Sequence, residues 1–245
     1  MTRDLTTRSR LDGISRMSVE STERSIAGSV LPVDRPGKIV AVGLNYRDHA
    51  SESAVEAPQA PIIFAKWSTC LIPNGSAIVL PPGITEVDWE AELAVVIGRT
   101  ARDIPVADAL SYVSGYTCMN DVSARKAQRD EGQWTRAKSF DTFGPIGPRV
   151  VPASEIGDPQ NLGVRARVNG ELMQSANTRD MIFGVAELIC RISASTTLEV
   201  GDIISTGTPA GVGAFRPTPV FLRPGDVVEI EIDKIGVLTN PVVAG

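Results

Sequence analysis

Two glutamates one residue apart, Glu90 and Glu92, lie at the start of the segment DWEAELAVVIG. In a strand, side chains at positions i and i+2 project from the same face. Residues 93–97, which follow, are apolar, so this strand is expected to pass from a polar end into a packed interior. Paired carboxylates repel each other unless a cation or a proton lies between them, and oxygen ligands suit Mg²⁺, Mn²⁺ or Ca²⁺. The pair therefore indicates a divalent metal site, although a half-exposed strand alternates in the same way.

Asp121 is a candidate for a third carboxylate ligand. It lies in GYTCMNDVSARKAQ, where residues 112–119 predict a second apolar strand that ends at Asn120 and Asp121, before a short polar helix. An aspartate at this place can cap the helix, bind a metal, or do both. Three carboxylates make a stronger case for a metal than two.

His49 is the only histidine of the chain, and Glu52 follows it by three residues in GLNYRDHASE. On a helix, this spacing places the imidazole and the carboxylate on one face, where the carboxylate fixes the tautomer of the ring and raises its basicity. Such a pair can act as a general base that deprotonates water. An ordinary solvated histidine fits the same ten residues.

The composition predicts what positions these side chains. The chain has 245 residues, of which 42% are hydrophobic, so it can bury one sizeable core, and it contains no apolar stretch long enough for a membrane span. Its formal charge of −5 and the absence of a basic stripe argue against binding to nucleic acid. We expect one globular domain that binds neither nucleic acid nor membranes.

The three cysteines are far apart and, with a single histidine, they form neither a disulfide framework nor a zinc site. Reduced thiols and a cytoplasmic location are expected. Residues 1–36 are interpreted as an N-terminal arm. The arm is rich in Arg, Ser and Thr, but its acidic residues argue against an organelle transit peptide. The catalytic domain is expected to span residues 37–245.

Strands are predicted to outnumber helices. The helical patterns cover residues 106–112, 123–130 and 181–192. The apolar runs predict strands at residues 38–42, 62–65, 77–80, 88–97, 113–119, 162–168, 202–205 and 227–232. This order is not a regular βαβ alternation, so the fold class is α+β, and a Rossmann or barrel layout is disfavoured. The glycine-rich segment TGTPAGVG lacks the lysine of a phosphate-binding loop and is interpreted as a loop that lines a pocket.

Six segments in order resemble the fumarylacetoacetate hydrolase family: GLNYRDHASE, DWEAELAVVIG, GYTCMNDVSARKAQ, GQWTRAKSFDTFGPIGP, VNGELMQ and GDIISTGTPAGVG. The similarity extends from about residue 38 to the C-terminus, and six ordered motifs are more specific than any one alone. The ending is similar to that of bacterial and mitochondrial members known only as fumarylacetoacetate hydrolase domain-containing proteins. The resemblance implies a mixed β-roll with a few short helices, usually assembled as a homodimer.

The resemblance also implies roles for particular residues. It assigns Mg²⁺ or Mn²⁺ to the carboxylates of Glu90, Glu92 and Asp121, and the water-activating pair to His49 and Glu52 on a short helix. It places Lys138 near the metal-bound oxygens, and Arg125, Gln128 and Thr208 in contact with the substrate. Each of these four has a simpler alternative. Lys138 can pair with Asp141 at the surface, the helix after Asp121 can turn Arg125 and Gln128 to solvent, and Thr208 can cap a turn.

The expected reaction is metal-dependent hydrolysis of the C3–C4 bond of a 2,4-dioxo acid, giving pyruvate or another 2-oxo acid and a carboxylic acid. The founding enzyme uses a further acidic ligand upstream of its histidine, where this chain has AVGL, so a smaller substrate of the acylpyruvate type is favoured. The same enolate chemistry allows decarboxylation or keto–enol tautomerisation of oxaloacetate instead. Diketo-deoxy sugar acids are a further candidate substrate class. A protein that binds a metal and a ligand without catalysis is an alternative of a different functional class.

Overall fold

Strand β6 (Ala91–Ile97) is buried along its whole length because the sheet that contains it is covered on both faces. Leu93 and Val95 belong to the large hydrophobic core. Ala94, between them, belongs to a smaller apolar cluster that also contains Ile39. Coverage of both faces explains why residues 93–97 form a continuous apolar run, where a strand with one solvated face would alternate.

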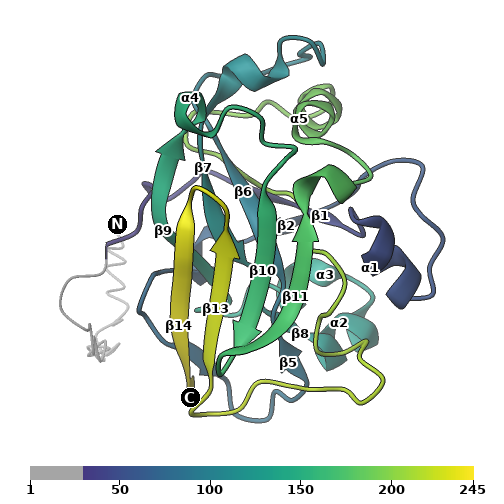
Figure 1. Cartoon of the computed structure of the whole chain (residues 1–245), viewed down its shortest axis with the longest axis vertical. Helices are drawn as coiled ribbons and strands as arrows, with labels where there is room; N and C mark the ends of the chain where they lie inside the picture. The colour runs from purple at the N-terminus through teal and green to yellow at the C-terminus, as the bar shows by residue number, and fades with distance from the viewer. Residues whose placement is uncertain (1–29) are drawn as a thin grey trace, which may run out of the picture.

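The computed structural model describes residues 30–245, which form two main sheets (Figure 1). The larger sheet has the strand order β2 (Ile62–Lys66), β1 (Ile39–Gly43), β12 (Ile203–Ser205), β6, β7 (Val113–Asn120), β9 (Gly144–Pro152) and β3 (Leu71–Pro73). The second sheet has the order β11 (Glu171–Asn177), β10 (Gly163–Val168), β13 (Val227–Ile232), β14 (Gly236–Ala244) and β4 (Ile78–Leu80). A short pair joins β5 (Val87–Asp88) to β8 (Ser123–Ala124).

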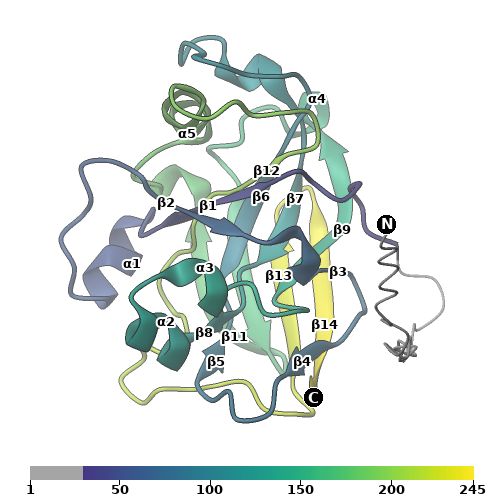
Figure 2. The ribbon, with the colours of Figure 1, turned by 180° about the vertical axis from the view of Figure 1, so that it is seen from behind.

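Both sheets are mixed. In the larger sheet, β1 pairs with β12 and β3 pairs with β9 in parallel, while β6 and β7 run antiparallel. Strands β10, β13 and β14 lie in front of β6 and β7 in Figure 1, and Figure 2 shows β1 and β2 on the other side. The large core lies between the sheets and contains Val95 and Tyr116 from one, and Val164, Ile230 and Leu238 from the other.

The helices are short and lie at the margins of the sheets. They are α1 (Arg47–Glu52), α2 (Arg125–Glu131), α3 (Trp134–Ala137), α4 (Ala153–Ile156) and α5 (Val185–Ser193), with 3₁₀ turns at Ser68–Cys70, Ala109–Tyr112 and Thr178–Asp180. Helices of this length depend on packing rather than on intrinsic propensity. Figures 1 and 2 both show α1, α2 and α3 on the same side of the molecule, where the polar end of β6 also lies.

The structure confirms the predicted α+β fold, a mixed β-roll with a few short helices. Three of the longer predicted elements are interrupted or shortened. The helix predicted at residues 181–192 forms only as Val185–Ser193, because Met181 pairs with Tyr46 in an isolated bridge. The strand predicted at residues 88–97 is interrupted at Trp89 and Glu90, and the helix predicted at residues 123–130 begins at Arg125 because β8 pairs with β5. The prediction of a helix at residues 106–112 is wrong. Only the 3₁₀ turn Ala109–Tyr112 forms there, because Val106 and Leu110 are exposed and provide no apolar face for a longer helix.

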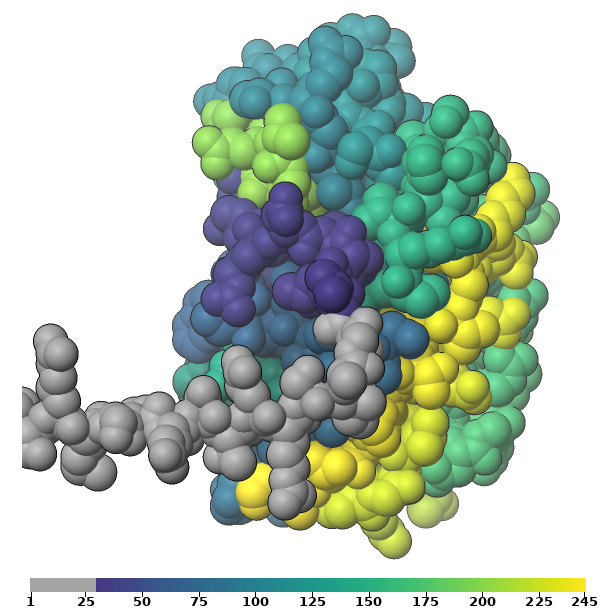
Figure 3. Space-filling model, turned by 90° about the vertical axis from the view of Figure 1, so that its left-hand side faces the viewer, coloured from purple at the N-terminus to yellow at the C-terminus, as the bar shows by residue number. Residues whose placement is uncertain are grey.

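Most of the predicted N-terminal arm lies outside the described residues. Within the described part, Leu31 and Val33 pack against the smaller apolar cluster that contains Ile39 and Ala94. Figure 3 shows this first described stretch, in purple, lying against the body of the molecule. The division into an arm and a domain at residue 36 remains a prediction. No helix within residues 30–245 is long and apolar enough to cross a membrane.

Candidate active site

The polar end of β6 is held by hydrogen bonds to the end of β7. The Glu90 amide donates to Asn120 Oδ1 at 3.0 Å, and the Asp121 amide donates to the Glu90 carbonyl at 3.0 Å. These two hydrogen bonds bring Asp121 beside Glu92, which lies in β6, and Glu90, which directly precedes β6. The carboxylates of Glu90, Glu92 and Asp121 are all buried, and one oxygen from each lies within 4.8 Å of the others. The three predicted ligands therefore form one cluster.

Two buried lysines contact this cluster. Lys138 Nζ donates to Glu90 Oε2 at 2.8 Å, to Asp121 Oδ2 at 2.9 Å and to Ser123 Oγ at 2.8 Å. Lys66 Nζ lies behind Asp121 and donates to its Oδ1 at 2.7 Å. Because Lys138 is only 2% exposed, the alternative in which it pairs with Asp141 at the surface is wrong. Asp121 does not cap the following helix, whose N-cap residue is Ala124.

Arg125, at the start of α2, is also buried and points back toward the carboxylates. Its Nε donates to Asp88 Oδ1 at 2.6 Å, and its Nη2 lies 2.6 Å from Glu90 Oε1. Its Nη1 donates to Gln128 Oε1 at 3.2 Å. The alternative in which Arg125 lies on a solvated helix face is therefore wrong, while Gln128 is partly exposed at the cavity edge.

The buried acids of the site outnumber its buried bases by one. The acids are Asp88, Glu90, Glu92 and Asp121, and the bases are Lys66, Arg125 and Lys138. Burial alone would raise the pKa of Glu90, but the positive charges of Lys138 and Arg125 outweigh burial and lower this pKa to about 2. Burial raises the pKa of Glu92 to about 8, and the negative charges of Asp121 and Glu90 act in the same direction.

The raised pKa of Glu92 means that a proton neutralises this fourth buried carboxyl when no metal is bound, and a divalent cation could take the place of that proton. Glu92 Oε2 accepts from Ser205 Oγ and, at 3.0 Å, from the Gly207 amide, yet no described cation pairs with it. Three clustered carboxylates are the hard oxygen donors that Mg²⁺ and Mn²⁺ prefer. The residues present therefore fit a divalent metal, as the sequence predicts.

The structure brings His49 and Glu52, the predicted general base and its partner, into contact. His49 Nδ1 lies 2.8 Å from Glu52 Oε1 on α1, and the histidine is only 5% exposed, so it is not an ordinary solvated side chain. Because an ionised carboxylate only accepts hydrogen bonds, this contact places the proton on Nδ1 and leaves Nε2 as the acceptor. The second oxygen of Glu52 accepts from the Gly211 amide at 2.9 Å.

These groups meet at a cavity of about 150 Å³. Its polar lining includes His49, Glu90, Arg125, Gln128, Lys138 and Thr208. Its apolar lining includes Val42, Leu44, Val55, Trp134 and Phe215. Phe215 packs over the His49 ring, with the ring centroids 5.9 Å apart, and over the Arg125 guanidinium at 5.7 Å. The remaining predicted site residues are not part of this lining but lie next to it: Glu52 contacts His49, Asp121 contacts Lys138, and Glu92 is clustered with Glu90.

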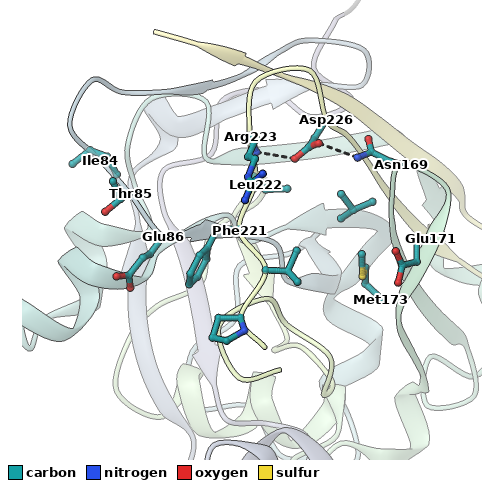
Figure 4. Close-up of a pocket in the computed structure, with 13 residues that line it drawn as sticks. Ile84, Thr85, Glu86, Asn169, Glu171, Met173, Phe221, Leu222, Arg223 and Asp226 are labelled. Carbon is teal, nitrogen blue, oxygen red and sulfur yellow. Dashed lines mark hydrogen bonds between the residues drawn. The ribbon is translucent and has the colours of Figure 1, made fainter. Parts of the chain in front are cut away.

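A larger groove of about 630 Å³ lies elsewhere and contains none of the predicted site residues (Figure 4). It is bounded by residues 84–86, 168–173 and 219–226. Its labelled hydrogen bonds connect Asp226 to Arg223 and Asn169, which are internal contacts of two turns. Size alone would select this groove, but the convergence of buried charges, the histidine and hydrogen-bond donors selects the smaller cavity.

Several site residues have no counterpart among the sequence predictions. Asp88 orients Arg125, and its spacing two residues before Glu90 in DWE was a usable signal. Lys66 had no such signal, because its partners are distant in sequence, whereas Gln174 ends the motif VNGELMQ, to which no site role was assigned. Thr208 does not simply cap a turn: it donates to the Ala91 carbonyl at 3.0 Å and accepts from Gln174 Nε2 at 2.8 Å.

Comparison with known proteins agrees with this geometry. Residues 38–243 match the model of the fumarylacetoacetate (FAA) hydrolase C-terminal family. The chain belongs to the fumarylacetoacetate hydrolase family. The match covers both sheets and every residue of the candidate site, so the family expectation drawn from the six motifs is confirmed.

Individual family members extend the comparison. The mitochondrial oxaloacetate tautomerase Fahd2a of Rattus norvegicus is 49% identical over 221 residues, which are 90% of this chain and 71% of that protein. The solved structure of 5-carboxymethyl-2-hydroxymuconate delta-isomerase from Mycobacterium smegmatis is 43% identical with a TM-score of 0.79, covering 89% of this chain and 82% of that one. Fumarylacetoacetate hydrolase from Exiguobacterium antarcticum is 39% identical with a TM-score of 0.79, covering 86% and 76%.

These names modify the functional expectation. The chain is an enzyme of this family, and its relatives include a tautomerase and an isomerase as well as a hydrolase. The predicted alternative, keto–enol tautomerisation, is therefore better supported than the predicted acylpyruvate hydrolysis. The homodimer and the cytoplasmic location remain predictions, and the rat relative is named as mitochondrial.

Proposed function

We propose that this protein is a metal-dependent keto–enol tautomerase that acts on oxaloacetate or a similarly small 2-oxo acid. The observation that carries the proposal is the position of His49. Its ring lines the small cavity beside Glu90 and Lys138, with Nδ1 held by Glu52 and Nε2 as the acceptor. A relative that is 49% identical is named an oxaloacetate tautomerase, which supports the same substrate class.

The carboxylates of Glu90, Glu92 and Asp121 would hold Mg²⁺ or Mn²⁺, which when bound supplies a Lewis acid for the oxygens of a 2-oxo acid. Lys138, hydrogen-bonded to two of these carboxylates, would add positive charge at the same end of the cavity. Arg125 and Gln128 line the cavity as donors for a second carboxylate, and Thr208 completes the polar lining.

The proposed reaction uses His49 as the proton carrier. His49 Nε2 takes a proton from C3 of the keto acid, and the C–H electron pair forms the C2–C3 double bond while the carbonyl π electrons move to oxygen. The imidazolium then returns this proton to the oxygen, which gives the enol, and the reverse sequence gives the ketone. Glu52 stabilises the imidazolium through Nδ1–H. No water molecule takes part in this sequence.

The apolar half of the cavity favours tautomerisation over hydrolysis. Trp134, Val55 and Phe215 form its wall, and the Phe215 ring contacts the His49 ring in a tilted arrangement, so apolar groups lie beside the base and offer few hydrogen bonds to an attacking water. This wall also offers few partners to the hydroxyl groups of a diketo-deoxy sugar acid. A small planar acid with two carboxylates fits the distribution of donors better.

Hydrolysis of a 2,4-dioxo acid is the second candidate. The same His49 and Glu52 pair would activate water for attack at C4, and one relative carries the name fumarylacetoacetate hydrolase. Decarboxylation of oxaloacetate is the third reaction open to the same polar groups. Both of these reactions break a carbon–carbon bond, whereas tautomerisation exchanges only a C3 proton.

A proton NMR time course in D₂O separates the three reactions. Oxaloacetate and acetylpyruvate would be incubated with protein and Mg²⁺, with Mg²⁺ alone, and with protein and a chelator. The proposal predicts loss of the C3 proton signal of oxaloacetate, without carbon–carbon cleavage, much faster with protein and Mg²⁺ together than in either control. Acetate and pyruvate formed from acetylpyruvate faster than in the controls would identify a hydrolase, and pyruvate formed from oxaloacetate faster than with Mg²⁺ alone would identify a decarboxylase. Exchange no faster than with Mg²⁺ alone would refute the proposal.

A further inference from the structure

The loop between β12 and β13 holds three acidic side chains of the site with its backbone. Each of three loop amides donates one hydrogen bond to a different carboxylate, two of them in the segment of residues 88–92 and one on α1. These bonds are Gly207 to Glu92 Oε2 at 3.0 Å, Gly211 to Glu52 Oε2 at 2.9 Å and Ala214 to Asp88 Oδ2 at 2.9 Å. Phe215 follows directly and packs on His49 and Arg125.

These three carboxylates connect the loop to three groups of the site. Glu92 belongs to the acidic cluster, Glu52 contacts His49 Nδ1, and Asp88 contacts Arg125 Nε. The position of this one loop is therefore coupled to the base, to the arginine and to the candidate metal ligands.

Strand β11 supports the loop. Gln174 Nε2 donates to Thr208 Oγ1 at 2.8 Å and to the Pro209 carbonyl at 2.7 Å. Met173, which is labelled in Figure 4 beside the large groove, turns its carbonyl toward Gly211. A Cβ at Gly211 would lie 2.2 Å from this oxygen, and the φ of Gly211 is +100°. Only glycine satisfies both the space and the backbone conformation here.

We propose that Gly211 is a positioning residue for the base. Its close approach to the Met173 carbonyl sets where its amide lies, and this amide fixes one oxygen of Glu52 so that the other faces His49 Nδ1. The imidazole is thereby kept in the Nδ1–H tautomer with Nε2 toward the cavity. The expected loss of kcat rests on the proposed function, because it takes His49 as the base. The expected effect on the tautomer of His49 does not depend on that function.

The test compares Gly211→Ala with Gly225→Ala. Gly225 has the same φ of +100°, but a Cβ added there would meet no described atom within 4 Å, so its substitution introduces the same backbone strain without the clash. Since the chain has one histidine, long-range ¹H–¹⁵N spectra of the tag-free protein report the tautomer of His49 alone. We expect Gly211→Ala to raise the Nε2–H population and lower kcat about 100-fold with a smaller change in KM. We expect Gly225→Ala to resemble the wild type.

The inference is overturned if Gly211→Ala keeps the wild-type tautomer, or if Gly225→Ala shifts it equally. Glu52→Asp gives a second route if Gly211→Ala does not fold, because the shorter side chain cannot span His49 Nδ1 and the Gly211 amide. The same tautomer shift is expected there, and its absence would also contradict the inference. If the wild-type protein has no tautomerase activity but Gly211→Ala still shifts the tautomer of His49, the proposed function is rejected and the positioning role of Gly211 is retained.

Discussion

Lys66 Nζ lies 2.7 Å from Asp121 Oδ1, and neither side chain has any exposed surface. The same ammonium group donates to the Phe143 carbonyl at 3.0 Å and to the Lys138 carbonyl. Lys66 therefore joins β2 to the acidic cluster and to the segment that carries Lys138. Nothing in the sequence around Lys66 indicates this role, because its partners are 55 or more positions away.

Substitution Lys66→Met is expected to destabilise the protein by about 3–5 kcal/mol, because it removes one of the two lysines that neutralise the buried Asp121 and leaves Asp121 Oδ1 and two carbonyls without this donor. The free energy of unfolding would be measured by urea denaturation. Lys126→Met is the control, since Lys126 forms an exposed pair with Asp130 on α2 and its loss should cost less than about 1 kcal/mol. Equal losses in the two variants would contradict a special role for the buried pair.

Substitution Glu92→Gln is expected to weaken Mn²⁺ binding at least about 10-fold, because it removes a carboxyl that can lose its proton to a bound cation while keeping the size of the side chain. Isothermal titration calorimetry of the purified protein measures this without any assay of activity. Glu171→Gln, in the exposed part of β11, is the matched control. Unchanged affinity in Glu92→Gln would remove Glu92 from the proposed ligands.

The stability of the metal-free protein is expected to fall as pH rises from about 5 to about 8. The pKa of Glu92 is raised to about 8 in the folded state, so the folded protein binds more protons than the unfolded chain in this range. The stability associated with the proton on Glu92 is fully present below the pKa of Glu92 in the unfolded chain. It is lost as pH rises through the pKa of about 8 that Glu92 has in the folded protein. Thermal unfolding at several pH values checks the slope, which Glu92→Gln should flatten; a stability that rises with pH in both proteins would oppose the assignment.

Substitution His49→Gln is expected to reduce the enzyme-dependent exchange of the C3 proton about 10²–10⁴-fold, because glutamine cannot carry the proton. Mn²⁺ binding should change little, since His49 is not among the clustered carboxylates. Comparing the exchange rate in D₂O with the calorimetric affinity separates the two effects. Full exchange activity in His49→Gln would show that another group moves the proton.

The sequence was sufficient to predict the groups that share a local pattern. Glu90 and Glu92 are two residues apart in an extended segment, and His49 and Glu52 are three apart on a helix, so backbone geometry alone places each pair together. Asp121 required knowledge of strand pairing, because it reaches Glu90 only through the register of β6 with β7. The six ordered motifs supplied that knowledge through the family.

The parts that were not predicted depend on contacts distant in sequence or on irregular strands. Strand β9 contains two prolines before its last residue, Pro152, and β14 contains Pro241, so both segments resemble turns. Strand β11 is polar because it lies at an edge, with much of its length exposed. The segment TGTPAGVG, which contains Gly211, was predicted to line a pocket, but its support by β11 depends on tertiary contacts that no local pattern indicates.

Substitution Phe215→Ala is expected to lower kcat/KM about 10-fold with little effect on stability. Phe215 is 43% exposed, so its removal costs little buried area, but its ring contacts His49 and lies 5.7 Å from the Arg125 guanidinium. These contacts help to orient the base and the arginine, so their loss lowers kcat/KM, while a partly exposed ring contributes no more than about 1 kcal/mol to folding. Leu172→Ala, which is 50% exposed on β11 and outside the cavity, is the control. The exchange assay and urea denaturation measure both quantities, and equal kcat/KM values in the two variants would reject Phe215 as part of the cavity wall that assists the reaction.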